Sequence, residues 1–499
     1  RRPPRSTLFP YTTLFPIYAG SLIGLISSVT LADGTALTIY SSAQPGGIPA
    51  EWYRPVPGQG QTYYGNIPGY AVVKEERPFA FDQGVGELRF TGVAALLDPT
   101  TVSFISLDDE ATKVVEQDYR FDLVSNQKLI ERFIDKDVTV MTTQGANPVA
   151  HSGTLLSASG GIVLQKPGGG IVTIREYNTI DFPSLPGGLL TQPTLVWTTF
   201  SPQGGEQSTR LAYQTTGITW WSDYNLVFTP GDDANSGTLE VGAWVSILNK
   251  SGGTYEDAKL KLVAGDVNRA PQRQGGQPRF QVDQSMRMEA AAVPKGFEEK
   301  AFGDYHLYTL GRPATIPDNS TKQLELFDAA RGVPVEKVFV YEGARNPTDV
   351  GVYLEFTNAK ANGLGIPLPQ GRIRVSQVDT ADGSLEFVGE DTIDHTAREE
   401  EISIKLGNSF DIVGERRVVE SNRDSGRKVM TQTIEVKVRN RTDKPVDLIV
   451  REPLGGGMKW KITQQSHDHT VKDANIIEFP VTLDPDEEEV VTYSVRYTW

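Results

Sequence analysis

The sequence has no cysteine among its 499 residues, and it has too few basic residues to balance the acidic ones. The lack of cysteine excludes disulfide bonds, thiolate zinc sites and cysteine nucleophiles, so buried apolar side chains must stabilise the fold. There are 48 Lys and Arg against 63 Asp and Glu, a formal net charge of -15. Because nucleic-acid phosphates need clustered cations, we expect no nucleic-acid partner.

Long apolar runs are also scarce. An uncharged stretch at residues 17–31 ends beside the small residues Thr30 and Ala32, and we interpret residues 17–32 as a truncated signal peptide. Residues 1–16, which repeat the string TLFP, differ in composition from everything after them, and we interpret them as a sequencing-adapter artefact. The stretch at residues 17–31 is too short to be a transmembrane anchor, and no other segment approaches the ~18 apolar residues of a membrane helix, so we expect no transmembrane helix.

Alternation with a period of two dominates the remaining sequence and predicts an all-β fold with few short helices. The clearest example lies at residues 239–247. There, five apolar residues predict the buried face of a strand and four others its outer face: Leu239, Val241, Ala243, Val245 and Ile247 against Glu240, Gly242, Trp244 and Ser246. One short helix is expected after Ser125, which can cap it, with an apolar stripe formed by Leu129, Ile130, Phe133 and Ile134.

The spacing of these strands predicts tandem β-sandwich-like domains with a small barrel between them. We expect an N-terminal β domain at 33–134 with the short helix at its end. The closely spaced short strands at 135–184 predict an SH3-like or Sm-like barrel. A central sandwich-like region follows at 185–345, with a mobile loop at 268–300 that has no apolar period, and a C-terminal sandwich at 346–499. Within the last domain, the turn-rich residues 440–445 predict an antiparallel hairpin between the strands around Val436 and Leu448.

Several long blocks of sequence, all in the same order along the chain, resemble the sequences of one protein family. They include GYAVVKEERPFAFDQGVGELRF, RLAYQTTGITWWSDYNLVF, WVSILNKSGGTYEDAKLKLVAGDVNR and VKVRNRTDKPVDLIVREPL, and the likeness spans nearly all of residues 33–499. The chain is identified on these blocks as a member of the envelope proteins that carry the domain of unknown function 4139, related to the mucoidy-inhibitor-A-like proteins. The resemblance implies a mostly β, exported protein and supplies no catalytic residues. Longer relatives carry a coiled coil, but this sequence has no heptad run.

The densest cluster of possible metal ligands is Ser466-His467-Asp468-His469. In a strand, His467 and His469 would share one face, so with Asp468 they form a candidate site for zinc or another divalent ion. A complete site needs a third or fourth ligand that the sequence does not identify. The alternative interpretation is a polar hairpin tip.

A second candidate is the aromatic group Trp220, Trp221 and Tyr224 in the segment GITWWSDY, which could stack on a sugar or a peptide. Neighbouring residues of a strand point to opposite faces, so at least one of the two tryptophans is expected in the core. The acidic segment TPGDDAN offers Asp232 and Asp233 as oxygen ligands for calcium, but it lacks the EF-hand spacing and is better explained as a solvated turn.

The expected function is that of a non-catalytic cell-envelope interaction or structural protein. It would be periplasmic, extracellular or associated with the outer membrane, and would bind a protein or glycan partner through sheet edges and loops without a cofactor. Two alternatives remain: a metal-dependent periplasmic hydrolase using His467, Asp468 and His469, and an outer-membrane-associated β protein, suggested by the terminal segment VTYSVRYTW.

Overall fold

The computed structural model describes residues 34–41, 43–53, 67–120, 122–144, 147–186, 189–191, 193–265, 297–302, 305–455 and 457–499. The predicted adapter artefact at 1–16 and the predicted signal peptide at 17–32 lie outside these residues, as does the part of the predicted mobile loop at 268–296. Residues 297–300 of that loop form the start of a strand. No helix of the described part is long and apolar enough to cross a membrane.

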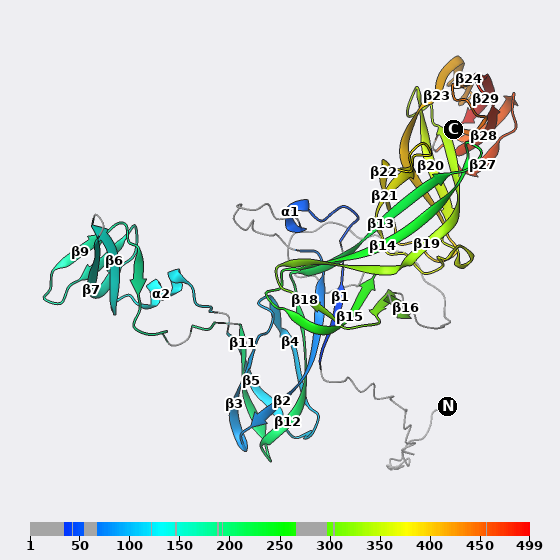
Figure 1. Ribbon diagram of the computed structural model, residues 1–499. Helices are drawn as coiled ribbons and strands as arrows, with labels where there is room; N and C mark the ends of the chain where they lie inside the picture. Colours follow the sequence, from blue (N-terminus) through cyan, green and yellow to red (C-terminus); the bar gives the residue numbers. More distant parts are fainter. Residues whose placement is uncertain are drawn as a thin grey trace, which may run out of the picture. The chain divides into compact units, whose positions relative to one another are not determined.

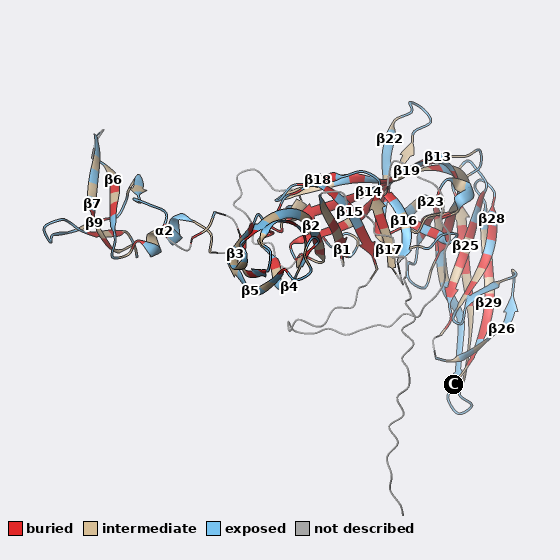
Figure 2. Ribbon diagram, turned by 90° about the horizontal axis from the view of Figure 1, so that it is seen from below, coloured by how far each residue is buried: buried red, intermediate tan, exposed pale blue. Residues whose placement is uncertain are grey.

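The described residues are mostly β-strand and form four sheets (Figure 1). Helices are short: α1 (Ala50–Tyr53), α2 (Asn126–Arg132) and a 3₁₀ turn at Lys360–Asn362. Buried and exposed positions alternate along many strands, as the red and pale segments of β25 and β28 show in Figure 2. The strand-rich fold predicted from the alternating pattern is therefore present.

The first sheet has eight strands in the order β16-β17-β15-β1-β2-β12-β4, with β18 also paired to β15. Its strands are β1 (Thr35–Tyr40), β2 (Tyr70–Phe81), β4 (Leu97–Ser106), β12 (Gly205–Thr215), β15 (Tyr255–Ala264), β16 (Phe297–Phe302), β17 (Tyr305–Leu310) and β18 (Ala314–Ile316). The predicted boundary between an N-terminal domain and a central region does not coincide with a sheet boundary, because strands from both sides of it pair here.

A three-stranded sheet, β3-β11-β5, packs on the eight-stranded one. It contains β3 (Gly84–Thr91), β11 (Thr194–Ser201) and β5 (Lys113–Arg120). Phe90 and Trp197 from this sheet share a core with Leu211 and Tyr213 of β12, and the Trp197 ring lies 5.4 Å from the ring of Phe104 on β4. The two sheets thus bury one apolar layer between them.

The third sheet has five strands in the order β10-β6-β7-β8-β9 and its own core around Val140, Leu155 and Leu164. The strands are β6 (Asp137–Gln144), β7 (Asn147–Ser157), β8 (Ile162–Gln165), β9 (Ile171–Ile174) and β10 (Thr179–Asp181). The end strands β9 and β10 are not paired with each other in the described part of the chain, so a closed barrel is not found here.

Helix α2 begins where predicted, since the Ser125 side chain accepts a hydrogen bond from the Lys128 backbone amide. Its apolar residues do not belong to the N-terminal domain, however. Phe133 is buried in the core of the five-stranded sheet, and Ile130 and Ile134 pack against the same core. The helix is therefore part of the five-stranded module, and its assignment to the end of the N-terminal domain is corrected.

The fourth sheet has thirteen strands and the main path β22-β21-β13-β14-β19-β20-β23-β24-β29-β26. Its strands are β13 (Ile218–Pro230), β14 (Ser236–Asn249), β19 (Ser320–Tyr341), β20 (Asp349–Thr357), β21 (Gly371–Val378), β22 (Leu385–Ile393), β23 (Glu401–Asp424), β24 (Val429–Asn440), β25 (Val446–Pro453), β26 (Lys459–Gln465), β27 (Thr470–Asp473), β28 (Ile476–Leu483) and β29 (Glu488–Thr498). Its strands contribute to two cores, one shared with the first sheet and one around Phe479 and Tyr493.

The predicted hairpin across residues 440–445 is wrong. Strand β24 pairs with β23 and β29, whereas β25 pairs with β19 and β28. The turn therefore carries the chain from one set of strands to another instead of closing a hairpin. The alternating pattern of the two strands was correct, but it does not specify the partners of either strand.

Candidate binding site

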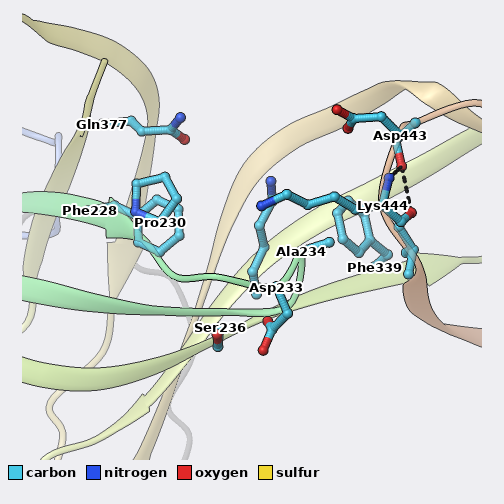
Figure 3. A pocket seen from close by; sticks show the side chains of 12 residues that line it. Phe228, Pro230, Asp233, Ala234, Ser236, Phe339, Gln377, Asp443 and Lys444 are labelled. Atoms are coloured by element: carbon cyan, nitrogen blue, oxygen red, sulfur yellow. Dashed lines mark hydrogen bonds between the residues drawn. The ribbon is translucent and has the colours of Figure 1, made fainter. Parts of the chain in front are cut away.

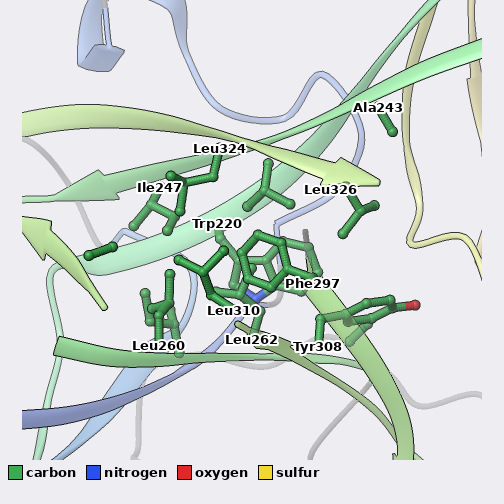
Figure 4. Close-up of a cluster of buried hydrophobic side chains, with 14 of the residues drawn as sticks. Trp220, Ala243, Ile247, Leu260, Leu262, Phe297, Tyr308, Leu310, Leu324 and Leu326 are labelled. Atoms are coloured by element: carbon green, nitrogen blue, oxygen red, sulfur yellow. The ribbon is translucent and has the colours of Figure 1, made fainter. Parts of the chain in front are cut away.

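The predicted aromatic group on β13 divides between the two faces of its strand. Trp220 is 3% exposed and Tyr224 is 1% exposed, and both belong to the main core. In Figure 4, Trp220 lies among Leu262, Phe297 and Leu310. The Tyr224 hydroxyl donates a 2.6 Å hydrogen bond to the Pro369 carbonyl. These two residues fill the core, so the interpretation of all three aromatics as one binding platform is corrected.

Trp221 points to the opposite face, where it belongs to a polar network around Asp223. The Trp221 indole N–H donates to Asp223 Oδ2 at 2.8 Å, and the Arg372 guanidinium donates to Asp223 Oδ1 at 3.1 and 3.3 Å. Ser246 Oγ completes the set at 3.3 Å. Asp223 is 7% exposed, so its charge is both buried and fully hydrogen-bonded.

A second guanidinium extends this network to the next strand. Arg374 donates to Glu390 Oε2 at 2.8 Å and lies 3.8 Å from Asp223 Oδ1. Two arginines from β21 thus neutralise one carboxylate on β13 and one on β22. The ion pairs share partners, and this orients the two planar guanidinium groups. Tyr53 of α1 covers part of Trp221, with the two ring centroids 5.4 Å apart, and it also hydrogen-bonds Arg372.

Strand register places a third tryptophan beside this network. Trp244 of β14 lies directly opposite Asp223 on one side and opposite Glu325 of β19 on the other. Residues directly opposite each other in a sheet share a face, so Trp244 lies on the same face as the ion pairs. Its side chain is 40% exposed. We call this surface the Trp244 face: Trp221, Asp223, Trp244, Glu325, Arg372, Arg374 and Glu390.

The exposed aromatic residue of the Trp244 face, Trp244, is not part of the aromatic group predicted from the sequence. The predicted group included the adjacent residues Trp220 and Trp221, but Trp220 lies in the core and Tyr53 partly covers Trp221. Trp244 occupies one of the outer-face positions of the alternating segment 239–247. A tryptophan at an outer-face position is the sequence pattern that could have predicted an exposed aromatic residue here. Arg372 and Arg374 lie 128 and 130 residues after Trp244 in the sequence, so local patterns could not have linked them to Trp244.

The predicted metal ligands lie between β26 and β27, where each histidine has a local polar partner. His467 Nδ1 lies 2.8 Å from Ser466 Oγ and its Nε2 lies 3.3 Å from Glu489 Oε1, while His469 Nδ1 lies 2.5 Å from Gln465 Oε1. Asp468 is 3.5 Å from Gln465 Nε2. In the described residues, no three His, Cys, Asp or Glu side chains form a group that could hold a metal ion. The structure thus supplies no observation in favour of a metal at this segment.

The comparisons with known proteins add one match. The family model described as "Domain of unknown function (DUF4139)" matches residues 209–499, which include most of β12, all of β13 to β29 and the whole Trp244 face. No curated protein matches the chain.

Proposed function

Because the chain belongs to the family defined by the domain of unknown function 4139, whose description assigns no activity, we propose a function from the site: a non-catalytic cell-envelope protein that binds a glycan through the Trp244 face. The observation that carries the proposal is an exposed indole beside a hydrogen-bonded network of guanidinium and carboxylate groups on a sheet. The signal peptide predicted at 17–32 supports an envelope location.

The chemistry of the Trp244 face favours a glycan over a protein partner. An indole ring stacks on the apolar C–H face of a pyranose, and planar polar side chains around it can hydrogen-bond the sugar hydroxyls. The centre of a protein interface is instead depleted of charge, with ~800 Å² buried on each partner. Here the residues directly opposite Trp244 are the carboxylates Asp223 and Glu325.

We also infer the finer architecture from the sheets. The eight- and three-stranded sheets form one sandwich, and the strands around Phe479 and Tyr493 form another. The five-stranded module is SH3-like or Sm-like. Support comes from its strand order, in which the first strand β6 lies between the last strand β10 and the second strand β7, and from the single core within the module.

The glycan proposal is tested by substituting Trp244. Purified protein is applied to an array of bacterial cell-wall and surface glycans, and its affinity for the best glycan is measured by calorimetry. We expect Trp244→Ala to weaken binding about tenfold or more, since an exposed aromatic anchor is a typical binding hot spot. The free energy of unfolding should change by less than about 1 kcal/mol, because Trp244 is substantially exposed.

Trp499 provides the matched control, since it is 42% exposed and lies under the Arg423 guanidinium, away from the Trp244 face in sequence and sheet position. Trp499→Ala should leave glycan affinity unchanged. Equal binding by Trp244→Ala and wild type would contradict the proposal. A second outcome would also contradict the glycan assignment: no glycan on the array binds, but wild type captures an envelope protein that Trp244→Ala does not. The partner would then be a protein.

A further inference from the structure

A small pocket lies where three segments distant in sequence meet: the β13–β14 turn, the C-terminal part of β19 and the β24–β25 turn. Its volume is about 210 Å³ (Figure 3). Apolar side chains form much of its lining, among them Phe228, Pro230, Phe339 and Val446. Asn235 joins the three segments, because its amide group bonds the Lys337 carbonyl and both the carbonyl and N–H of Asp447 at 2.9 Å. These hydrogen bonds fix the three segments that form the pocket relative to one another.

Lys337 of β19 lines this pocket without a compensating anion. Its ammonium lies 5.1 Å from the centre of the Phe339 ring, and among the described residues no carboxylate pairs with it and no side-chain hydrogen bond satisfies it. Burial lowers the pKa of Lys337 below its ordinary value of 10.5. A partly buried cation without a counter-ion is costly, and a bound anion would offset that cost.

The other charged groups of the pocket leave a place for such an anion. Lys444 extends from the β24–β25 turn and donates to the Asp232 carbonyl at 3.0 Å, so a second ammonium lies at the same pocket (Figure 3). Asp233 already accepts hydrogen bonds from the backbone N–H of Asn235 and from Ser236, and these bonds lower its pKa. Asp443 lies at the exposed rim. Neither carboxylate is paired with Lys337.

We propose that this pocket, the Lys337 pocket, binds a small organic carboxylate with an apolar body. The ligand's carboxylate would sit on the Lys337 ammonium, and its apolar part would lie against Phe228 and Phe339. The volume is below the roughly 300–1,000 Å³ of pockets for drug-sized ligands, so one amino-acid-sized group fits. Both a free carboxylic acid and the C-terminal residue of a peptide have this chemistry. The site is separate from the Trp244 face and does not depend on the glycan proposal.

The test uses the full chain and four probes followed by ligand-observed NMR and calorimetry. Phenylacetate represents a free acid and phenylacetamide its neutral isostere; N-acetyl-glycyl-phenylalanine and its C-terminal amide represent a peptide end. We expect each acid to bind at least about tenfold more tightly than its amide, and Lys337→Met to remove that difference. Tighter binding of the peptide acid identifies a peptide terminus as the ligand, and tighter binding of phenylacetate identifies a free acid.

Lys322→Met is the matched control, because Lys322 lies on the same strand and donates to the Thr315 carbonyl outside the pocket. It should leave all four affinities within about twofold of wild type. Lys337→Gln is measured in parallel, so that the test stands if Lys337→Met fails to fold. The proposal is overturned if no acid binds at 10 mM, if acids and amides bind equally, or if the folded Lys337 variant binds like wild type.

Discussion

At the residue scale, Glu75 shows how a buried carboxyl group couples this fold to pH. Glu75 lies on β2, is 5% exposed, and has the Tyr213 hydroxyl 3.5 Å away and the Arg77 guanidinium beside it. Burial raises its pKa above the ordinary value of 4.5, and the contacts with Arg77 and Tyr213 offset only part of that effect. The folded chain therefore keeps the Glu75 proton to a higher pH than the unfolded chain does.

The consequence is a loss of stability as pH rises. The stabilising contribution of protonated Glu75 is complete below about pH 4.5 and is lost as pH rises through the raised pKa. We expect Glu75→Gln to remove this decline, so that the urea midpoint of the variant relative to wild type is higher at pH 7.5 than at pH 4.5. Glu206→Gln, at an exposed position of β12, should leave the pH dependence unchanged. A Glu75→Gln variant that declines with pH as steeply as wild type would contradict this account.

At the element scale, two strand ends use the same asparagine device. Asn249 ends β14 and Asn440 ends β24, and both are fully buried. In each, Oδ1 accepts from the N–H and the hydroxyl of the residue two positions on, Ser251 or Thr442, at 2.7–3.1 Å. Each Nδ2 donates to the carbonyl four positions on at 2.8 Å. The asparagine thus replaces the backbone pairing that ends with the strand.

Asn440 also joins its turn to a distant strand, since Nδ2 lies 3.2 Å from both the Leu483 and Asp484 carbonyls. We expect Asn440→Ala to lower the free energy of unfolding by about 3 kcal/mol, because it leaves several buried polar groups without partners. Asn440→Asp should cost at least as much, since it keeps the acceptor and removes the donor. Urea unfolding checks both, with exposed Asn422→Ala as a control expected within about 0.5 kcal/mol. Wild-type stability of Asn440→Asp would count against the donor role.

At the scale of the whole molecule, the five-stranded module is inserted into a β-hairpin. Arg120 at the end of β5 pairs with Thr194 at the start of β11, and the module comes between them. The chain enters and leaves the module side by side: Val124 N–H donates to the Leu190 carbonyl at 2.8 Å, and Leu190 N–H donates to the Asp122 carbonyl at 3.0 Å. With its own buried core, the module meets the requirements for an independent folding unit.

Excising the module should therefore leave the remaining chain folded. Replacing residues 121–193 by Asn-Gly would join β5 to β11 through a two-residue turn of the type favoured in hairpins. We expect the shortened protein to remain soluble, to unfold cooperatively and to keep its glycan affinity, and residues 122–191 alone to give a β-type circular dichroism spectrum. Aggregation of the shortened protein together with an unfolded isolated module would show that the two parts fold only as one.

The sequence by itself determined which apolar residues face inward along strands with a clear period of two. The alternation at 239–247 predicted a strand, and its five apolar residues are all buried. Ser125 was predicted to cap a helix and does so. The neighbouring residues Trp220 and Trp221 were expected on opposite faces of their strand, and Trp220 is in the core. These features depend on the period of a strand or on hydrogen bonds within a few residues, so the local sequence specifies them. The family resemblance, carried by long ordered blocks, was confirmed over residues 209–499.

Only the tertiary structure decided which strands pair and what their outer faces bring together. The hairpin predicted across residues 440–445 failed because backbone hydrogen bonds are the same for any partner, and only packing of the whole core selects β19 and β28 for β25. Trp244 and Arg372 meet on one face, and Lys337 and Lys444 at one pocket, although more than 100 residues separate each pair. Such juxtapositions depend on the register of distant strands, which a period of two cannot encode.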